Sequence, residues 1–417
     1  AGSARDGGGG LIESTHSTVN FIGGLIGGDR NPDGTIKDGN YADNNGAGLA
    51  IKGNSTVNFI DTVIRGNFAE DSGGGVNIEG PSTVTFTNGG VIDNFSIGEH
   101  GGGLRIADAT VSFDGTSISN NFAGDRIYSA NPGNLVGGAM HVTNAAKVAL
   151  VDVIMNNNQA EGRGGAIFAD RNSVIDFSSS TPGTKISEIS GNTTIDGGTS
   201  LGGGAVYLTH AGTTLNLTDA TVSGNRSADD AGAIFIQSAS IANLTRVEVS
   251  GNEAQNQGGG IFLESDQSLL NLDTVEISGN ATRVSNGGGI QTNGTVTGNN
   301  ILIQGNRTGF DLENGQVASG SNDRVGGGIY IAGAEASFVA TNVVIADNQT
   351  YGRGGGVFIS DGKLDLTNFV IRNNETNSDG NVNRGRGGGV YSESIGTVFL
   401  ENGEISGNRA EGHGGGL

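Results

Sequence analysis

A short repeat runs through the whole chain and constrains its fold more than any other feature. A triplet of small residues followed by one aliphatic residue occurs fourteen times. The aliphatic residues that end these tetrapeptides are Leu11, Leu49, Val76, Leu104, Met140, Ile167, Val206, Ile234, Ile261, Ile290, Ile329, Val357, Val390 and Leu417. Most neighbouring tetrapeptides lie 27–29 residues apart. A regular period of about 20 to 50 residues is typical of solenoids and other repeat folds.

An asparagine forms the second mark of the repeat. The pattern Asn-x-[Ala/Ser/Thr] occurs once per repeat, and in most repeats an aliphatic residue stands three positions earlier, as Ile64 does before Asn67. Asparagine tolerates the left-handed backbone of a turn, and stacked amide side chains can form a hydrogen-bonded ladder. We therefore predict turn and ladder roles for Asn67, Asn94, Asn225, Asn252, Asn280, Asn306, Asn348 and Asn408.

Between the two marks, apolar residues alternate with polar ones in three short runs, as in Leu270-Asn271-Leu272 and Val275-Glu276-Ile277. This period of two predicts three short strands per repeat, separated by turns. A repeat this small buries its apolar face only by stacking on its neighbours. The sequence therefore predicts an all-β fold, a right-handed parallel β-helix of about 13 coils of about 27 residues.

The repeat covers the chain from end to end, so we expect a single solenoid over residues 1–417. Where neighbouring marks lie further apart than usual, the extra residues are expected to form loops. These expected insertions are 12–36, 122–136, 172–188, 193–201, 307–325 and 375–386.

Composition excludes several classes of function. There is no Cys, and the net charge is −21, from 22 Lys and Arg against 43 Asp and Glu. A chain this acidic, with no basic run, is a poor partner for nucleic acid. Its longest apolar runs are far shorter than the roughly 18 to 20 residues of a membrane-spanning helix, so no membrane insertion is expected. The chain starts at Ala1 without a leader, which is expected of a mature protein that is secreted or displayed at the cell surface.

Tetrapeptides such as Gly-Gly-Ala-Met140, Gly-Gly-Ala-Ile167 and Gly-Gly-Ala-Val206 alternate with apolar-x-x-Asn tetrapeptides. This pairing resembles the repeats of the polymorphic outer-membrane protein family. The resemblance implies a right-handed β-helix that is exported and associated with adhesion. The chain departs from that family's pattern in having Ile or Val where Phe is typical, and we expect no transmembrane β-barrel after the repeats.

The first strand of each repeat carries one middle residue between two aliphatic ones, and this middle residue is expected to point outward. Seven of the last eight such residues are aromatic, namely Phe168, Tyr207, Phe235, Phe262, Tyr330, Phe358 and Tyr391. We call them the aromatic stripe. It is either a contact surface, for a neighbouring β-helix or for glycans, or a surface that loops of the same chain cover. The segments between the repeat asparagine and the next glycine triplet are longer before the three tyrosines, which favours the interpretation that loops cover these residues.

Enzyme signals are weak. Asp229-Asp230 is the one adjacent acidic pair that resembles a catalytic site, and it lies in a short turn expected to be solvated. The five histidines fall mostly at different repeat positions and form no ligand set. We therefore expect no enzymatic activity, no cofactor and no metal.

The two ends of the chain lie at nearly the same point of the repeat. Gly8, Gly9, Gly10 and Leu11 match Gly414, Gly415, Gly416 and Leu417. One copy could therefore continue the stack of another, and such a head-to-tail contact produces a filament. The alternative is that residues 1–417 are a piece of a longer chain.

We accordingly predict a structural subunit of an exported filament. Its partners are other copies of the same chain, placed head to tail, with lateral bundling through the aromatic stripe. An adhesin passenger that binds glycans or host proteins is the second hypothesis, and a polysaccharide lyase or hydrolase is the third.

Overall fold

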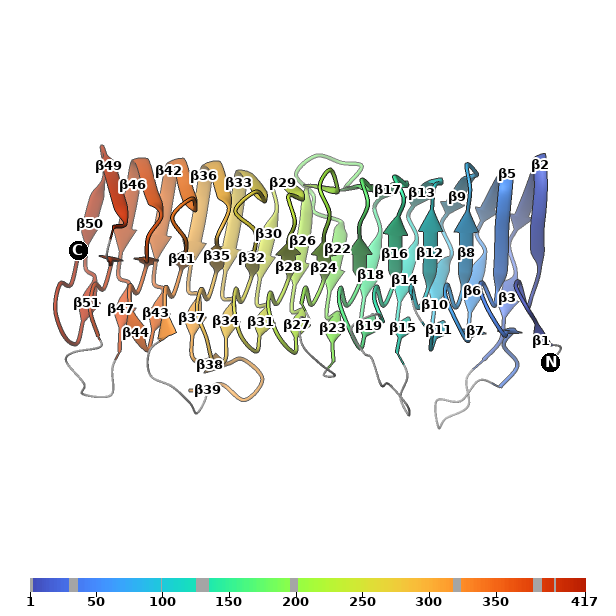
Figure 1. The fold of residues 1–417 in the computed structure, drawn as a ribbon, viewed down its shortest axis with the longest axis horizontal. Helices are drawn as coiled ribbons and strands as arrows, with labels where there is room; N and C mark the ends of the chain where they lie inside the picture. Colours follow the sequence, from blue (N-terminus) through green and yellow to red (C-terminus); the bar gives the residue numbers. More distant parts are fainter. Residues whose placement is uncertain are drawn as a thin grey trace. The chain divides into compact units, whose positions relative to one another are not determined.

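The structure is a computed structural model that describes residues 3–29, 37–98, 100–124, 135–195, 202–317, 324–377, 385–393 and 395–417, without the side chains of residues 3, 4, 316 and 317. Contacts divide the chain into two compact units. Unit 1 comprises Ala1–Leu201 and Ala205–Ala220, and unit 2 comprises Gly202–Gly204 and Thr221–Leu417. Each unit consists of parallel strands stacked coil upon coil (Figure 1), and the described residues contain no helix. The predicted parallel β-helix is thus confirmed for both units.

Each coil has four strand positions, one more than the sequence predicts. Position 1 follows the glycine triplet, position 2 comes next along the chain, position 3 precedes the repeat asparagine and position 4 follows that asparagine directly. Position 4 holds only two residues, too few to show a period of two in the sequence. In some coils two adjacent positions form one long strand, with a residue of positive φ at the junction, such as Thr274 with φ +57°.

In unit 1, β2 (Leu11–Ile22) and β5 (Leu49–Ile60) span positions 1 and 2. Position 1 continues with β8 (Val76–Glu79), β12 (Leu104–Ala107), β16 (Met140–Thr143), β20 (Ile167–Ala169) and β24 (Val206–Leu208). Position 2 holds β9 (Thr83–Thr87), β13 (Thr110–Asp114), β17 (Lys147–Val151), β21 (Val174–Ser178) and β25 (Thr214–Thr218). Position 3 holds β3 (Leu25–Gly27), β6 (Val63–Arg65), β10 (Gly90–Ile92), β14 (Ser117–Ser119), β18 (Ile154–Asn156) and β22 (Ser187–Ser190). Position 4 holds β1 (Ser3–Ala4), β4 (Tyr41–Ala42), β7 (Phe68–Ala69), β11 (Phe95–Ser96), β15 (Phe122–Ala123), β19 (Gln159–Ala160) and β23 (Thr193–Thr194).

In unit 2, position 1 holds β28 (Ile234–Ile236), β32 (Ile261–Leu263), β35 (Ile290–Thr292), β41 (Ile329–Ile331), β45 (Val357–Ile359) and β48 (Val390–Ser392). Position 2 holds β29 (Ile241–Thr245) and β49 (Thr397–Glu401), and position 3 holds β26 (Ala220–Ser223, from Thr221 on), β30 (Glu248–Ser250) and β50 (Glu404–Ser406). Four strands span positions 2 and 3, namely β33 (Leu269–Ser278), β36 (Thr295–Gln304), β42 (Ser337–Ala346) and β46 (Lys363–Arg372). Position 4 holds β27 (Arg226–Ser227), β31 (Glu253–Ala254), β34 (Ala281–Thr282), β37 (Arg307–Thr308), β43 (Gln349–Thr350), β47 (Glu375–Thr376) and β51 (Arg409–Ala410). Outside these positions lie the hairpin strands β38 (Phe310–Asp311) and β39 (Gln316–Val317), and the pair β40 (Arg324–Val325) and β44 (Gly352–Arg353).

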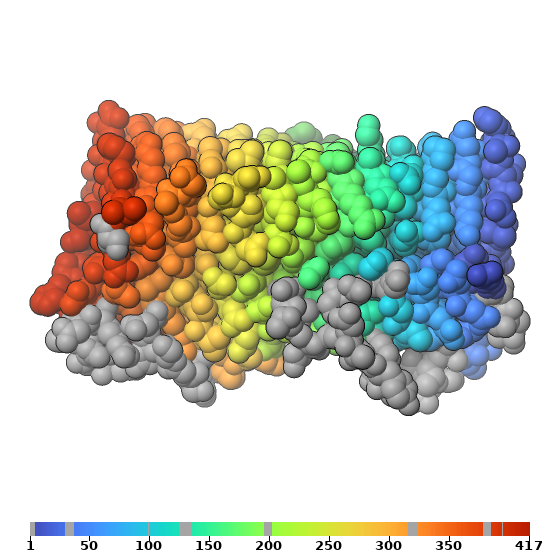
Figure 2. Space-filling view, viewed as in Figure 1, coloured from blue at the N-terminus to red at the C-terminus, as the bar shows by residue number. Residues whose placement is uncertain are grey.

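Strands at the same position pair in parallel and in register, so equivalent residues stack on one another. At position 2 of unit 1, Phe21 pairs with Phe59, and Phe86 pairs with both Phe59 and Phe113. Their rings stack inside the coils with centroids 5.0, 4.6 and 4.6 Å apart. Because side chains alternate along a strand, one of every two consecutive residues points into the core. Figure 2 shows the coils as successive colour bands within each unit.

The glycine triplet allows the backbone of adjacent coils to approach closely at one corner. Gly73 opens a triplet with φ +63°, a conformation that side chains disfavour. A Cβ on the next residue, Gly74, would lie 2.3 Å from the carbonyl oxygen of Phe95 and 2.4 Å from that of Gly102. The small residues of the repeat are therefore a steric requirement of the corner.

The first coil corrects one residue of the predicted pattern. Gly7, with φ +68°, opens the first triplet, so Gly10 and not Leu11 takes the aliphatic position. Leu11 pairs with Ala50 and is 49 % exposed, whereas Leu49 is buried. Four consecutive glycines left the start of this triplet ambiguous in the sequence.

The structure also narrows the predicted insertions. Residues 12–22 of the first one belong to β2, and the insertion at 172–188 reduces to residues 179–186 between β21 and β22. Most of the others fall outside the described residues, at 30–36, 125–134, 196–201, 318–323 and 378–384. The described part of 307–325 includes the hairpin β38–β39.

Candidate functional site

The repeat asparagines form a continuous ladder in each unit. In unit 2, the backbone N–H and Nδ2 of Asn252 both donate to Oδ1 of Asn280, at 3.0 and 2.9 Å. Asn280 in turn donates to Oδ1 of Asn306 in the same way, at 3.0 Å for both bonds. Its Nδ2 also donates to the carbonyl of Val249, three residues before Asn252, at 2.9 Å. These bonds explain the spacing of the apolar-x-x-Asn tetrapeptide.

The predicted ladder residues all take part in it. Asn67 and Asn94 belong to the ladder of unit 1, which runs from Asn40 to Asn192. Asn225, Asn252, Asn280, Asn306, Asn348 and Asn408 belong to that of unit 2, which also includes Asn374. Apart from Asn40 and Asn408, which lie in outer coils, the ladder asparagines are buried. The buried asparagines of the ladder therefore have a structural role and are out of reach of a ligand.

The aromatic stripe is not an exposed surface. Phe168, Tyr207, Phe235, Phe262 and Phe358 are at most 6 % exposed, and Tyr330 and Tyr391 are half-buried. Within each unit the rings contact one another; Phe168 and Tyr207 stack at 5.4 Å, and Phe235 meets Phe262 edge-on at 5.2 Å. The prediction that these side chains face solvent is wrong for the five buried residues, and only Tyr330 and Tyr391 keep some exposed surface for a lateral or glycan contact.

In several coils the residue just before the glycine triplet covers the stripe. The Arg353 guanidinium lies 5.4 Å from the Phe358 ring and 5.7 Å from the Tyr391 ring, and Arg163 lies 5.4 Å from the Tyr207 ring. At Gly202, a Cβ would lie 2.7 Å from the ring of Phe235. The chain itself thus covers the stripe, as one interpretation predicted, but with short connections as well as with long ones.

A second aromatic row went unnoticed in the sequence. Tyr41, Phe68, Phe95 and Phe122 occupy the outward side of position 4 in unit 1, directly after four repeat asparagines. Their rings stack with centroids 5.4, 5.2 and 5.0 Å apart. The Tyr41 hydroxyl donates to Glu70, and this bond raises the pKa of Tyr41 to about 12. The signal for this row was the aromatic residue in the x position of Asn-x-[Ala/Ser/Thr].

Ionisable groups lie at the corner where the stripe runs, among them the buried His141 and the partly buried Asp230. In unit 1, His141 Nε2 lies 3.5 Å from Asp170 Oδ1. Burial lowers the pKa of His141 and outweighs the opposing effect of Asp170. In unit 2, burial raises the pKa of Asp230 to about 7, helped by the nearby charge of Asp229, while the backbone N–H of Gln257 donates to Asp230 Oδ1 at 2.9 Å.

The acidic pair is therefore part of the coil packing. Asn256 Nδ2 donates to Asp229, and the Asn256 backbone N–H donates to the Asp229 carbonyl at 2.8 Å. Asp230 is partly buried, contrary to the expectation of a solvated turn. Among the described residues, no group of three or more His, Asp or Glu side chains is arranged to hold a metal ion.

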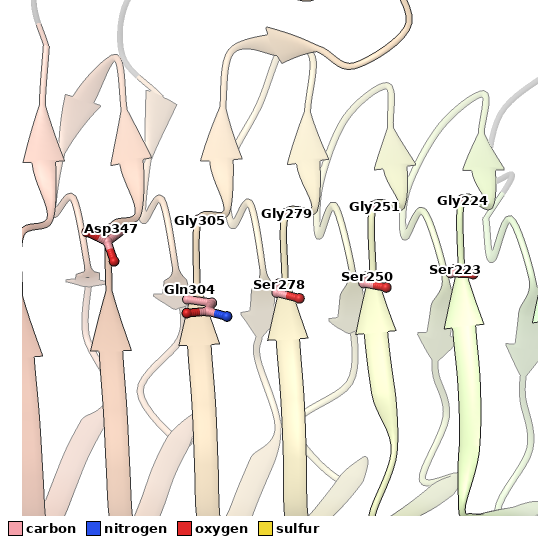
Figure 3. A pocket seen from close by; sticks show the side chains of 9 residues that line it. All are labelled: Ser223, Gly224, Ser250, Gly251, Ser278, Gly279, Gln304, Gly305 and Asp347. Carbon is pink, nitrogen blue, oxygen red and sulfur yellow. The ribbon is translucent and has the colours of Figure 1, made fainter. Parts of the chain in front are cut away.

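A groove of about 650 Å³ runs along unit 2 where position 3 ends (Figure 3). Ser223, Ser250 and Ser278 line it, each followed by a glycine with φ +62°. A Cβ on Gly224 or Gly251 would meet no atom within 4 Å, so there is open space above these glycines at the bottom of the groove. The backbone N–H groups of the glycines donate to carbonyls of the next coil at 3.0 Å. The groove therefore offers hydroxyls, but no free backbone donors, to a ligand.

The outer coils have incompletely covered cores. In unit 1, Val19 and Phe21 of β2 are partly exposed, although their partners Val57 and Phe59 are buried. In unit 2, Val398 and Leu400 of β49 are partly exposed, although their partners Leu364 and Leu366 are buried. The predicted end residues Gly8, Gly9 and Gly10 lie in the first of these coils and Gly414, Gly415, Gly416 and Leu417 in the last.

The ladders are also incomplete at the outer coils. Among the described residues, the Asn408 backbone N–H has no acceptor and Asn40 Oδ1 has no donor. Elsewhere these two groups bond to each other between adjacent coils, as Asn374 N–H does to Asn408 Oδ1 at 2.9 Å. An equivalent coil stacked on either outer coil would complete the ladder and cover the core.

Comparison with known proteins identifies the repeat. A family model for the Chlamydia polymorphic membrane protein repeat matches residues 152–170. This segment contains Asn158 of the ladder and the triplet before Ile167, which are the two marks of the repeat. No curated protein and no solved structure matches the chain significantly. The described residues include no apolar helix of membrane-spanning length. The chain is thus a parallel β-helix repeat protein that resembles the polymorphic membrane proteins, which is consistent with a place at the cell surface.

Proposed function

We propose that the chain is a structural subunit of a cell-surface filament, in which the outer coil of one copy stacks on the outer coil of the next. The complementarity of the two outer coils supports this proposal. One offers the Asn408 N–H as a donor, and the other offers Asn40 Oδ1 as an acceptor. Because β4, which follows Asn40, pairs with β1, this contact requires β51 of one copy to take the place of β1 in the next copy. The partly exposed core side chains of β2 and β49 would be covered by the same contact, and burial of apolar surface would drive it.

The role is structural and not enzymatic. The acidic pair that a lyase or hydrolase would need is engaged by Asn256 and Gln257 of the neighbouring coil. An adhesin passenger is the alternative, favoured by the matched repeat and by the open groove lined by Ser223, Ser250 and Ser278.

Electron microscopy of the purified 417-residue chain tests the proposal. Filaments are expected for the unchanged chain and for Phe399→Glu, because Phe399 points to the side of the β-helix. Leu400→Glu, one residue later, is expected to give separate particles, because Leu400 points into the core that a second copy would cover. Circular dichroism must show the same strand content in both variants.

A second variant blocks the contact through the backbone. A Cβ on Gly388 would lie 2.5 Å from the carbonyl of Gly415 in the next coil, whereas a Cβ on Gly415 would meet only the Asn408 carbonyl, at 2.9 Å. Gly415→Val should therefore shorten filaments while disturbing its own chain only in the last coil, at the Asn408 carbonyl. Separate particles of the unchanged chain, or filaments unaffected by Leu400→Glu and Gly415→Val, contradict the proposal. Binding of the separate particles to a glycan array would then favour the adhesin.

A further inference from the structure

A hairpin in unit 2 lies outside the coils and crosses several of them. Strands β38 and β39 form an antiparallel pair that leaves the coil after β37 (Figure 1). The backbone N–H of Leu312 donates to Glu253 Oε2 at 2.7 Å, and Arg226 Nη1 lies 2.6 Å from Glu313 Oε2. Arg226 is on β27 and Glu253 on β31, and strands β27, β31, β34 and β37 pair in that order. The hairpin therefore joins the fourth of these coils to the first.

Glu253 is the centre of the attachment. Its side chain is 6 % exposed, with Oε1 2.8 Å from Arg283 Nε and 3.4 Å from Arg226 Nη2. Arg283 also pairs with Asp311 of the hairpin. A buried carboxylate is costly unless it is paired and hydrogen-bonded. The arginines and the Leu312 N–H supply this compensation, and the Leu312 bond exists only while the hairpin is closed.

Within the hairpin, the Asp311 side chain accepts the hydrogen bonds that hold the turn. The backbone N–H groups of Glu313 and Asn314 donate to Asp311 Oδ1 at 2.9 and 3.3 Å, and Asn314 Nδ2 donates to Oδ2 at 2.9 Å. These bonds and the pairing with Arg283 together outweigh burial and lower the pKa of Asp311. The carboxylate is therefore charged near neutral pH and available to Arg283.

The forces that hold the hairpin differ from those that hold the coils. The side chains of Arg226 and Glu313 are 36 % and 67 % exposed, so salt screens their attraction. The coils are held by backbone ladders and by a buried apolar core, which salt does not screen. The free energy of closing the hairpin is thus sensitive to charge, while that of stacking the coils is not.

We propose that residues 309–315 are a releasable strap. Closed, the strap ties together four successive coils of unit 2. Open, it leaves the coils folded and hydrates Glu253. In a solenoid each coil contacts only its neighbours, so a tie across four coils resists separation in a way that the repeat alone does not. The ionic strength at the protein surface would set how often it opens.

Hydrogen exchange measured peptide by peptide tests the strap. Raising NaCl from about 20 mM to about 1 M reduces the Debye length to about 3 Å, and screening of the exposed Arg226–Glu313 pair should lower protection of the Leu312 amide by up to about fivefold. Peptides containing Asn252 and Asn280 should keep their protection. Glu253→Gln should give the same loss at low salt. Glu375→Gln is the matched control, because Glu375 lies at position 4 and pairs with Arg409 at 2.8 Å, away from the strap.

A second variant separates release of the strap from damage to the coils. Glu313 is largely exposed, so Glu313→Gln leaves the coils intact and should still accelerate exchange at Leu312. The proposal is overturned if the Leu312 amide keeps its protection in 1 M salt and in both variants. It is equally overturned if that amide exchanges only together with the coil peptides, since the strap would then have no opening of its own.

Discussion

Replacing Asn280 by alanine tests the ladder most directly. The side chain is fully buried, accepts two hydrogen bonds from Asn252 and donates to Val249 and Asn306. After truncation, the Asn252 backbone N–H loses its acceptor and the Val249 carbonyl loses this donor. Each orphaned buried group costs about 1–3 kcal/mol, so the free energy of unfolding should fall by about 2–6 kcal/mol.

The matched control is Asn271→Ala. Asn271 is also in a row of stacked side chains, because its Nδ2 donates to Asn243 Oδ1 at 2.7 Å, but this row is exposed on the outer face of the coils. Water replaces the lost bonds there, and the change should stay within about 0.5 kcal/mol.

Urea unfolding followed by circular dichroism gives both values, and hydrogen exchange at the Asn252 amide shows whether the loss is local. Repeat proteins can unfold in segments, so the exchange measurement carries the comparison if the urea transition is broad. The reasoning fails if Asn280→Ala costs less than about 1 kcal/mol or no more than Asn271→Ala.

Three further outcomes are expected. Gly224→Ala should cost about 1 kcal/mol, from positive φ alone, whereas Gly259→Ala should cost more than about 3 kcal/mol because its Cβ would lie 2.3 Å from the Gly288 carbonyl oxygen; equal losses in urea unfolding would refute this. The pKa of Asp230 is about 7 in the folded chain against an ordinary 3.8, so the folded chain holds the proton more tightly than the unfolded chain. The stability that this proton provides is complete below pH 3.8 and is lost as the pH rises to 7. Asp230→Asn should raise Tm more at pH 8 than at pH 4, and an equal effect at both would contradict the assignment. Burial lowers the pKa of His141 below its ordinary 6.5, so the unfolded chain binds the proton and stability falls as the pH drops below that value; His141→Gln should lessen the fall in Tm between pH 7.5 and pH 5.

Local patterns predicted the coil well. The alternation of Leu270 and Leu272 with Asn271 gave the inward and outward sides of a strand, and the small triplets gave a corner too tight for side chains. The ladder followed from asparagine chemistry, because one amide can both accept from the preceding coil and donate to the next. These features depend on neighbours at a fixed spacing, which a repeat makes visible.

The same reasoning could not predict which residues lie over a given side chain or how a loop packs on distant coils. A period of two shows which side of a strand Phe358 occupies, but not that Arg353 lies over its ring. The hairpin at 310–317 lies within a predicted insertion, yet nothing in the sequence shows that it reaches back to Arg226. The row headed by Tyr41 was missed because a strand of two residues has no period to detect.

The asparagine ladder gives each unit a direction. Between successive coils of the ladder, the amide oxygen accepts from the preceding coil and the amide nitrogen donates to the next, so the amide dipoles point the same way. A coil laid on in the reverse sense would set two oxygens face to face at the position of Asn280, and one slipped by a residue would leave the amide beside an apolar chain. Such a stack therefore grows with a fixed polarity, because each coil binds the next coil in one orientation only.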